Sequence, residues 1–308
     1  MAILLNNTGD DNAPWRQVLS QELPHLAIFE PARITDPHAI NYAVIWEHPH
    51  DDLHRYPNLK AILNLGAGTD HLDLDPALDK MKGVPIVRLI DPDVGIDMAH
   101  YTLYWTMHFQ RDYEQYRRHQ TERTWGKIKR PRIQDWRVAV LGMGRIGEFV
   151  AQQLLVMGYS VNVWNRSDKS LNGAQSFFGQ AQLHAALSNV NVVVNCLPLT
   201  AETTGLIEES CFAAMPSDSY LINISRGAVV DQSALVAALE TQQIAGAALD
   251  CFEVEPLPQD SALWAMPNVH ITPHMSGATY ARSAALAVVD NIKKMERGEQ
   301  PSPIVRTT

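Results

Sequence analysis

A glycine-rich turn is the most informative chemical signal in the sequence. Residues 142–147 read Gly-Met-Gly-Arg-Ile-Gly, directly after the apolar run Arg137–Leu141 and before an apolar, helix-like stretch. In this context the pattern is typical of a turn that binds the pyrophosphate of a dinucleotide. Gly142 permits a tight turn, Gly144 lets the backbone approach the phosphates, and Gly147 lets helix and strand pack closely. The alternative is an unrelated turn between a strand and a helix.

The end of the next apolar run, Val161–Trp164, bears on which dinucleotide is bound. An NAD site usually carries Asp or Glu there, because a carboxylate binds the ribose hydroxyls. This sequence has Asn165, Arg166 and Ser167 instead. A guanidinium forms charge-assisted hydrogen bonds with a 2′-phosphate, which a carboxylate would repel. We therefore expect NADPH to be preferred over NADH, unless Arg166 stacks on the adenine or lies in solvent.

Four further polar side chains follow the ends of apolar runs: Arg226, Asp250, Glu255 and His274. Ligands bind beyond the carboxyl ends of strands in open parallel sheets, so we expect these side chains to share one site. His274 can donate a proton near neutral pH, and Glu255 can orient its ring. Arg226 can bind a carboxylate and polarise a carbonyl. Together, a proton donor, a carboxylate that orients it and a cation suit acid–base chemistry on an anionic substrate. Taken singly, each residue could equally be a helix cap, a surface charge, a core histidine or an ion-paired arginine.

The first half of the chain has weaker signals. The turn Gly66-Ala67-Gly68 follows the apolar run Ala61–Leu65 and precedes a predicted helix, so its backbone is a candidate anion site. A plain turn is the alternative. Trp46 ends another run and could close a substrate pocket or belong to the core. Residues 48–54 contain three histidines, but we favour a solvated or helix-capping loop over a metal site, and expect no metal.

Apolar runs of strand length alternate with amphipathic stretches of helix length along most of the chain. This alternation predicts an α/β fold with doubly wound parallel sheets. A long helix is expected over Asp97–Tyr116, between two series of strands, and a last helix over Tyr280–Gly298, before an extended tail. The expected strands are Ile3–Leu5, Leu26–Phe29, Tyr42–Trp46, Ala61–Leu65, Ile86–Leu89, Arg137–Leu141, Val161–Trp164, Val190–Asn195, Tyr220–Ile224, Ala245–Leu249 and Val269–Thr272.

Composition excludes several classes of protein. The 308 residues carry a net charge of −9, which disfavours nucleic acid as the main partner. No apolar run has the roughly 18 residues of a spanning helix, and the N-terminus has no basic segment typical of a secretory signal. Three cysteines without CxxC spacing favour neither a disulfide framework nor zinc, and fit the cytoplasm. The basic stretch at 111–132 is expected to be a solvated connector or an oligomer arm.

The chain resembles the D-2-hydroxyacid dehydrogenase family over essentially its whole length. Three segments carry the resemblance: Leu221–Asp231, Ala248–Pro258 and Ile271–Thr279. Within the family, the chain is most similar to the short glyoxylate/hydroxypyruvate reductase A branch, through residues 42–46, 63–70 and 164–167. The resemblance implies two Rossmann-like domains, an active site in the interdomain cleft and a homodimer. The substrate-binding domain would comprise residues 1–97 with 280–308, and the dinucleotide-binding domain 98–279.

The resemblance also assigns roles to individual residues. Arg226, Glu255 and His274 would be catalytic. The cofactor would contact Gly142, Met143, Gly144, Arg145, Ile146, Gly147, Asn165, Arg166, Ser167, Pro198 and Asp250, the last at the nicotinamide amide. The substrate would contact Trp46, Gly66, Ala67, Gly68, Arg226 and His274.

The sequence as a whole therefore predicts a cytoplasmic, NADP(H)-dependent reductase of small 2-oxo acids, with glyoxylate and hydroxypyruvate as preferred candidates. Two alternatives remain: a dinucleotide-sensing binding protein of the corepressor type, and a related dehydrogenase with another substrate. The intact set of Arg226, Glu255 and His274 favours an enzyme. Glu255 also argues against formate dehydrogenase, which resembles this chain but replaces that glutamate.

Overall fold

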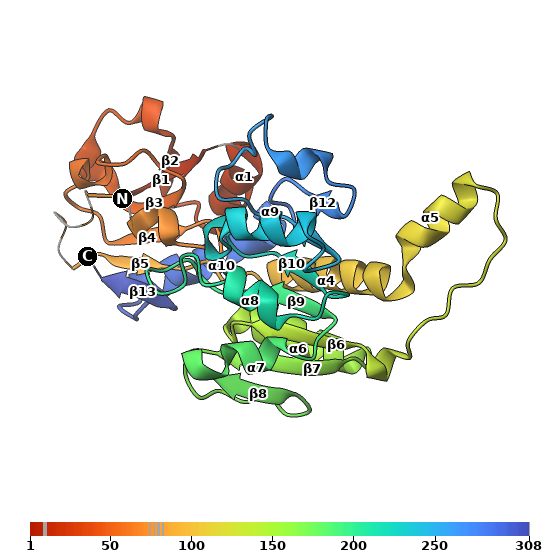
Figure 1. Ribbon diagram of the computed structural model, residues 1–308. Helices are drawn as coiled ribbons and strands as arrows, with labels where there is room; N and C mark the ends of the chain where they lie inside the picture. Colours follow the sequence, from red (N-terminus) through yellow and green to blue (C-terminus); the bar gives the residue numbers. More distant parts are fainter. Residues whose placement is uncertain (9–10, 74, 77, 79–80, 82, 308) are drawn as a thin grey trace. The chain divides into compact units, whose positions relative to one another are not determined.

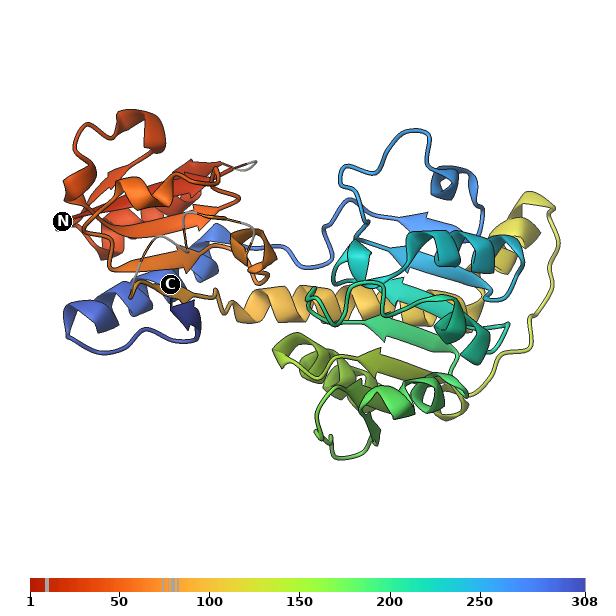
Figure 2. The same ribbon diagram turned by 60° about the vertical axis from the view of Figure 1, so that its left-hand side comes forward.

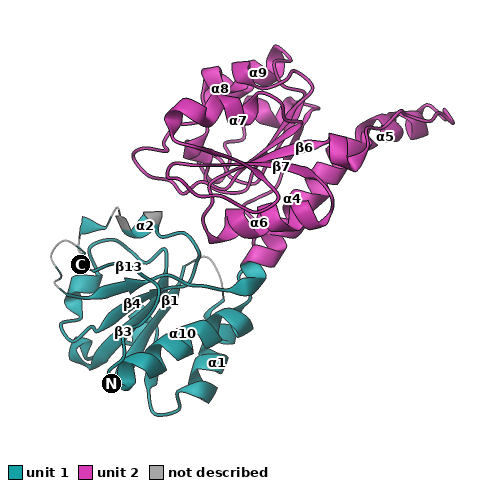
Figure 3. Ribbon diagram, turned by 90° about the horizontal axis from the view of Figure 1, so that it is seen from below, with its two compact units in different colours: residues 1–94, 278–308 teal, residues 95–277 magenta. Residues whose placement is uncertain are grey.

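The computed structural model describes residues 1–308 except 9–10, 74, 77, 79–80, 82 and 308. The chain forms two compact units, coloured separately in Figure 3: unit 1 comprises residues 1–94 and 278–308, and unit 2 comprises residues 95–277. Each unit contains one sheet whose strands are parallel or almost all parallel, so the predicted α/β class is confirmed. The roles expected for the two domains, in binding substrate and dinucleotide, stay predictions.

Unit 1 is built around a six-stranded sheet with the order β13-β5-β4-β3-β1-β2. Every neighbouring pair is parallel except β13 and β5, which are antiparallel. The central strands are almost fully buried, because helices and loops cover both faces. The elements are β1 (Ala2–Asn7), α1 (Asn12–Glu22), β2 (Ala27–Phe29), β3 (Ile40–Trp46), β4 (Ala61–Asn64), α2 (Asp70–Asp73), β5 (Pro85–Val87), α10 (Ala281–Glu296) and β13 (Ile304–Thr307).

The last helix of the chain, α10, packs beside the first helix, α1, against the sheet of unit 1 (Figure 3). Its apolar face spans Ala284 to Ile292 and joins the core cluster that contains Trp15 and Leu19. Lys293 on α10 also forms an ion pair with Glu22 on α1. The two ends of the sequence therefore share one hydrophobic core.

Unit 2 is built around a seven-stranded parallel sheet with the order β12-β11-β10-β9-β6-β7-β8 (Figure 2, green to blue). The strand order reverses beside β6, which is where open parallel sheets bind ligands. The elements are α4 (Pro92–Arg111), α5 (Tyr113–Thr121), β6 (Arg137–Leu141), α6 (Arg145–Val156), β7 (Ser160–Asn165), β8 (Gln175–Phe178), α7 (Leu183–Leu187), β9 (Val192–Asn195), α8 (Glu209–Ala214), β10 (Tyr220–Asn223), α9 (Gln232–Glu240), β11 (Gly246–Leu249) and β12 (Val269–Ile271).

The register of this sheet aligns the ends of five strands. Leu141 pairs with Asn195, Asn195 with Asn223, Asn223 with Leu249, and Leu249 with Ile271. Neighbouring strands lie about 4.8 Å apart, so the segments that follow these residues emerge side by side along one edge. The register therefore gathers the glycine-rich turn and the polar residues after β10, β11 and β12 at the same edge of the sheet.

The long helix expected over Asp97–Tyr116 is two helices. Asp112 adopts a left-handed backbone, with φ of 50°, and ends α4 after Arg111. Its side chain then accepts a hydrogen bond from the N–H of Gln115 and caps α5. The segment 122–132 after α5 is exposed and projects from its unit (Figure 1), and Trp125 is fully exposed.

Two strands were not predicted. β8 (Gln175–Phe178) is a short edge strand without an apolar run, and β13 lies in the tail that was expected only to be extended. Across the part of the chain that the structure describes, none of the helices combines the length and hydropathy needed to cross a membrane.

Candidate active site

The glycine-rich turn has the geometry that its sequence predicts. Gly142 has φ of +96°, and a Cβ there would lie 2.9 Å from the carbonyl oxygen of Cys196. A Cβ at Gly147 would overlap the carbonyl oxygen of Gly142, so only glycine allows this helix start to pack against the strand end. Gly144 has open space around its Cα and begins α6 without a side-chain cap. The first turn of α6 can therefore donate hydrogen bonds from its N–H groups to phosphate oxygens.

Asn165, the last residue of β7, organises the neighbouring turn. Its side-chain oxygen accepts a hydrogen bond from the N–H of Met143, and its amide donates to the carbonyl and hydroxyl oxygens of Ser167. Arg166 points into solvent, with a side chain that is 77% exposed and 3.8 Å from Glu202. The guanidinium is therefore available to a ligand. A contact with a 2′-phosphate stays a prediction, as do the contacts expected from Arg145, Ile146 and Pro198.

His274 and Glu255 form a hydrogen-bonded pair beyond β12 and β11. The Nδ1 atom of His274 lies 2.8 Å from Oε2 of Glu255. The other oxygen of Glu255 accepts a hydrogen bond from the N–H of Phe252, which fixes the carboxylate. Because Nδ1 is engaged, Nε2 is the ring nitrogen that can exchange a proton with a ligand.

The pair perturbs both pKa values in the direction that acid–base chemistry needs. The hydrogen bond that His274 donates to Glu255 raises the pKa of His274, against desolvation and the positive charge of Arg226, which lower it. Partial burial works to raise the pKa of Glu255, but the hydrogen bonds from His274 and Phe252 outweigh burial and leave that pKa lowered. The imidazolium is thus stabilised beside an ionised carboxylate.

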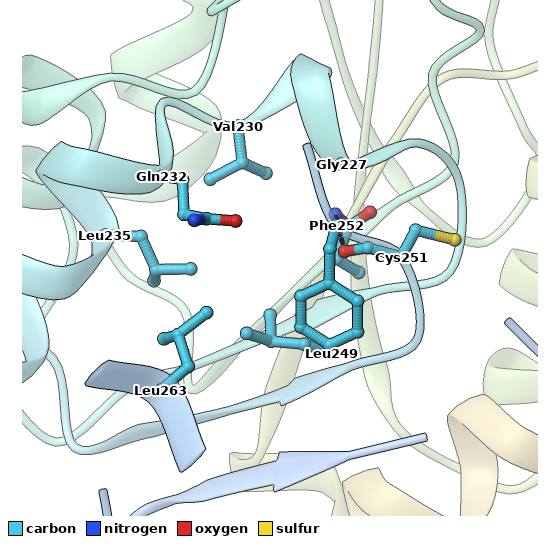
Figure 4. A pocket seen from close by; sticks show the side chains of 9 residues that line it. Gly227, Val230, Gln232, Leu235, Leu249, Cys251, Phe252 and Leu263 are labelled. Carbon is cyan, nitrogen blue, oxygen red and sulfur yellow. Dashed lines mark hydrogen bonds between the residues drawn. The ribbon is translucent and has the colours of Figure 1, made fainter. Parts of the chain in front are cut away.

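Arg226 is brought to the same place by a close backbone contact. A Cβ at Gly227 would overlap the backbone of Phe252, so glycine lets the segment after β10 lie against the segment after β11. Figure 4 shows Gly227 beside Phe252 and Cys251, above a small apolar cavity lined by Val230, Leu249 and Leu263 among others. Arg226 is close enough to act electrostatically on His274 and Glu255. The structure therefore brings these three predicted catalytic residues together.

Asp250 is fully buried and holds the loop that carries His274. One carboxylate oxygen accepts hydrogen bonds from the Thr272 hydroxyl and the N–H of Met275, and the other accepts from the N–H of Ser276. The N–H of His274 donates to the carbonyl oxygen of Asp250. These bonds hold His274 in a left-handed backbone with φ of 52°. A contact between Asp250 and the nicotinamide amide stays a prediction.

Tyr101 on α4 extends this network. Its hydroxyl lies 2.7 Å from the hydroxyl of Thr272, which in turn donates to Asp250. Burial raises the pKa of Tyr101 to about 12, so the phenol stays protonated. Tyr101 is not predicted from the sequence, because nothing in its local pattern separates it from the other aromatic residues of α4.

Asparagines at strand ends are a second group that the sequence analysis missed. Asn195 donates to the side chain of Asn223, and Asn223 donates to the carbonyl oxygen of Arg226 and accepts from the N–H of Ser225. These buried amides therefore hold the backbone of the segment that carries Arg226. The signal was present in the sequence: a polar amide ends an otherwise apolar run.

Asn64 plays the same part in unit 1, where it ends β4. Its side-chain amide donates to the carbonyl oxygens of Gly66 and Gly68 at 2.7 Å each. In a trans peptide the N–H points opposite to the C=O, so the N–H groups of Ala67 and Thr69 point away from Asn64. Gly66 lies directly against the indole ring of Trp46. Binding of a substrate carboxylate by this turn stays a prediction.

The histidine-rich loop differs from its prediction in one respect. His48 is buried rather than solvated, and its two ring nitrogens lie 2.9 Å from Asn6 Nδ2 and Asp52 Oδ2. His50 and His54 are exposed. His48 is thus a core histidine that ties the end of β1 to the loop after β3.

Part of unit 2 matches the model of a known protein family. Residues 103–276 match the family model described as "D-isomer specific 2-hydroxyacid dehydrogenase, NAD binding domain". Glyoxylate/hydroxypyruvate reductase A of Serratia proteamaculans is 36% identical over 296 residues, which is 94% of each chain. The enzyme of the same name from Photorhabdus laumondii is 35% identical over 309 residues, covering 99% of this chain and 98% of that protein.

Solved structures show the same similarity. The D-isomer specific 2-hydroxyacid dehydrogenase of Xanthobacter autotrophicus, in complex with NADPH and MES, aligns with a TM-score of 0.91 and 37% identity over 100% of this chain and 97% of that one. The NADPH-dependent glyoxylate/hydroxypyruvate reductase of Sinorhizobium meliloti, in complex with NADP and sulfate, aligns with a TM-score of 0.91 and 28% identity over 99% and 98%.

We expect Asp250→Asn to destabilise unit 2 by about 1–3 kcal/mol, because the amide that replaces one oxygen would face a backbone N–H and leave it unsatisfied. The melting temperature, followed by circular dichroism, measures this effect. Asp218→Asn changes an exposed aspartate of the same unit and is the matched control. Equal melting temperatures for the two variants would contradict the role given to Asp250.

Proposed function

The chain belongs to the D-isomer specific 2-hydroxyacid dehydrogenase family, and from that premise we propose that it reduces glyoxylate and hydroxypyruvate with NADPH. The products are glycolate and D-glycerate. The observation that carries this proposal is the hydrogen-bonded pair His274–Glu255 within the electrostatic reach of Arg226. This set supplies a proton donor, a group that orients it, and a cation for an anionic substrate.

The side chains of unit 2 divide the work of the reaction. Arg226 binds the carboxylate of the 2-oxo acid and polarises its carbonyl group. The hydride comes from the reduced nicotinamide. His274 donates a proton from Nε2 to the carbonyl oxygen, because its Nδ1 is held by Glu255. Glu255 keeps the ring oriented and stabilises the imidazolium before the proton leaves.

The turn at residues 142–147 fits a dinucleotide, since its glycines leave a cradle that a Cβ would fill. Arg166 and Ser167 supply a cation and a hydroxyl for the 2′-phosphate of NADP(H). Related structures from Xanthobacter autotrophicus and Sinorhizobium meliloti hold NADPH or NADP, which supports this cofactor.

We place the enzyme in the cytoplasm as a homodimer. The arm formed by α5 and residues 122–132 supports pairing, because it presents Trp125 fully exposed and Tyr113 half-exposed. Aromatic residues are enriched at protein interfaces relative to the rest of the surface.

The purified protein is expected to oxidise NADPH when glyoxylate or hydroxypyruvate is added, and His274→Asn is expected to lower kcat by about 10²–10⁴-fold. Asparagine suits this test because it tolerates the left-handed backbone of position 274. Steady-state kinetics with a panel of 2-oxo acids and both reduced nicotinamides measures the effect.

Two further measurements distinguish the possible reasons for a loss or absence of activity. NADPH affinity, measured by calorimetry, should be nearly unchanged in His274→Asn. A wild-type protein that binds NADPH but oxidises it with none of the acids would instead be a dinucleotide-sensing protein. Activity confined to larger 2-oxo acids would reject the proposed substrates while keeping the mechanism.

The pH dependence of the reductive rate should be set by the His274–Glu255 pair. The raised pKa of His274 keeps the proton-donating form populated to higher pH, so the reductive rate falls only as pH rises through that raised value. Glu255→Gln removes the carboxylate charge and should move this fall to lower pH. The measurement is kcat/KM for glyoxylate against pH. An unshifted profile would show that another group donates the proton.

Arg166→Ala should weaken NADPH binding about tenfold while leaving NADH binding unchanged, since the lost charge-assisted contact is solvent-exposed and so near the low end of about 1.5–3 kcal/mol. The ratio of kcat/KM for the two cofactors measures the effect, with little change in kcat at saturation. Glu202→Gln is the control, because it removes the nearest acid without removing the guanidinium. A wild type that prefers NADH would reverse the electrostatic argument.

A further inference from the structure

We propose that His108, Glu114 and His270 form a binding site for a divalent transition metal, with Zn²⁺ as the best fit. The three side chains lie in unit 2, on α4, α5 and β12, and belong neither to the glycine-rich turn nor to the His274–Glu255 pair. Two imidazoles and one carboxylate are a ligand set that zinc accepts in proteins, with further positions left for water.

The ligand atoms of the three side chains all lie within 4.8 Å of one another. In one pair, Nε2 of His108 and Oε1 of Glu114 are 3.6 Å apart. Ligand atoms at about 2.0–2.2 Å from a tetrahedral zinc ion lie roughly 3.3–3.6 Å from one another. Side-chain shifts of about 1 Å would bring the three ligand atoms to this spacing.

Each ligand is brought in by a different local feature. Asp112 breaks the helix with its left-handed backbone, so α5 turns and returns Glu114 to His108, six residues earlier. His270 lies at the middle of the edge strand β12, and its ring stacks on Trp105 of α4 with centroids 4.4 Å apart. The rings of His108 and His270 meet edge to face at 5.0 Å.

His108 offers a buried ring nitrogen to the cluster. The Nε2 atom of His108 is buried and has no hydrogen-bond partner among the described residues. A buried ring nitrogen without a partner costs free energy that a bound metal ion would recover.

One carboxylate oxygen of Glu114 is hydrogen-bonded to an arginine, and the other is available to a metal ion. Its Oε2 accepts a hydrogen bond from Nε of Arg117 at 2.8 Å, whereas Oε1 faces His108. The arginine orients the carboxylate, as partners of metal-binding residues commonly do. Its positive charge also opposes a cation, so we expect moderate affinity.

A metal at this site would join α4, α5 and β12 at the base of the exposed arm. β12 leads directly into the loop of His274, and α5 leads into the arm at residues 122–132. The expected consequence of binding is therefore a more stable unit 2.

The test uses the full-length protein, stripped with a chelator and then dialysed against Zn²⁺ or Co²⁺. Cys251, Glu255 and His274 form a second possible metal cluster at the active site, so the titrations are made in the His274→Asn background. We expect one metal per chain, a tetrahedral Co²⁺ absorption spectrum and a higher melting temperature with Zn²⁺.

His108→Ala, His270→Ala and Glu114→Gln should each weaken binding at least about tenfold, because each removes one of three protein ligands. His184→Ala is the matched control, since this exposed histidine of unit 2 lies outside the cluster. If a histidine variant fails to fold, the metal affinity of Glu114→Gln tests the proposal instead. This change replaces a partly exposed side chain with one of the same shape, so folding should be preserved. Absence of metal binding, or binding that Glu114→Gln leaves unchanged, would overturn the proposal.

Discussion

The architecture of the active site depends on one buried carboxylate. Asp250 accepts three hydrogen bonds from the loop after β12, two of them from backbone N–H groups. A buried charge is tolerated only when it is fully hydrogen-bonded, so the loop must take the single path that satisfies both oxygens. That path includes the left-handed backbone of His274, and it brings the imidazole to Glu255.

The charges around His274 act in opposition. Glu255 and Asp250 favour the imidazolium, whereas desolvation and Arg226 favour the neutral ring. The net result favours protonation while leaving a cation, Arg226, to attract an anionic substrate. A site with carboxylates alone would hold the proton more firmly and would repel a 2-oxo acid.

Motifs and strand periodicity were enough to predict the α/β fold, most strands, and the grouping of Arg226, Glu255 and His274, because parallel strands align their carboxyl ends. The missed features depend on longer-range structure. The break at Asp112 overrides an unbroken helical pattern, β8 and β13 are edge strands without apolar runs, and His48 is buried by partners far along the chain. The roles of Asn64, Asn195 and Asn223 become evident only once the loops they hold are known.

The sharing of unit 1 between the two ends of the chain has a consequence for synthesis on the ribosome. Unit 2 is one continuous stretch, residues 95–277, so all of its strands are synthesised before α10. The core of unit 1 is complete only when α10 is present, because the apolar face of α10 packs around Trp15 and Leu19. Because domains fold as units, residues 1–94 belong to a unit that is completed only after unit 2 has been synthesised. Until α10 has been made, the nascent chain leaves exposed the apolar surface that α10 covers in the folded unit.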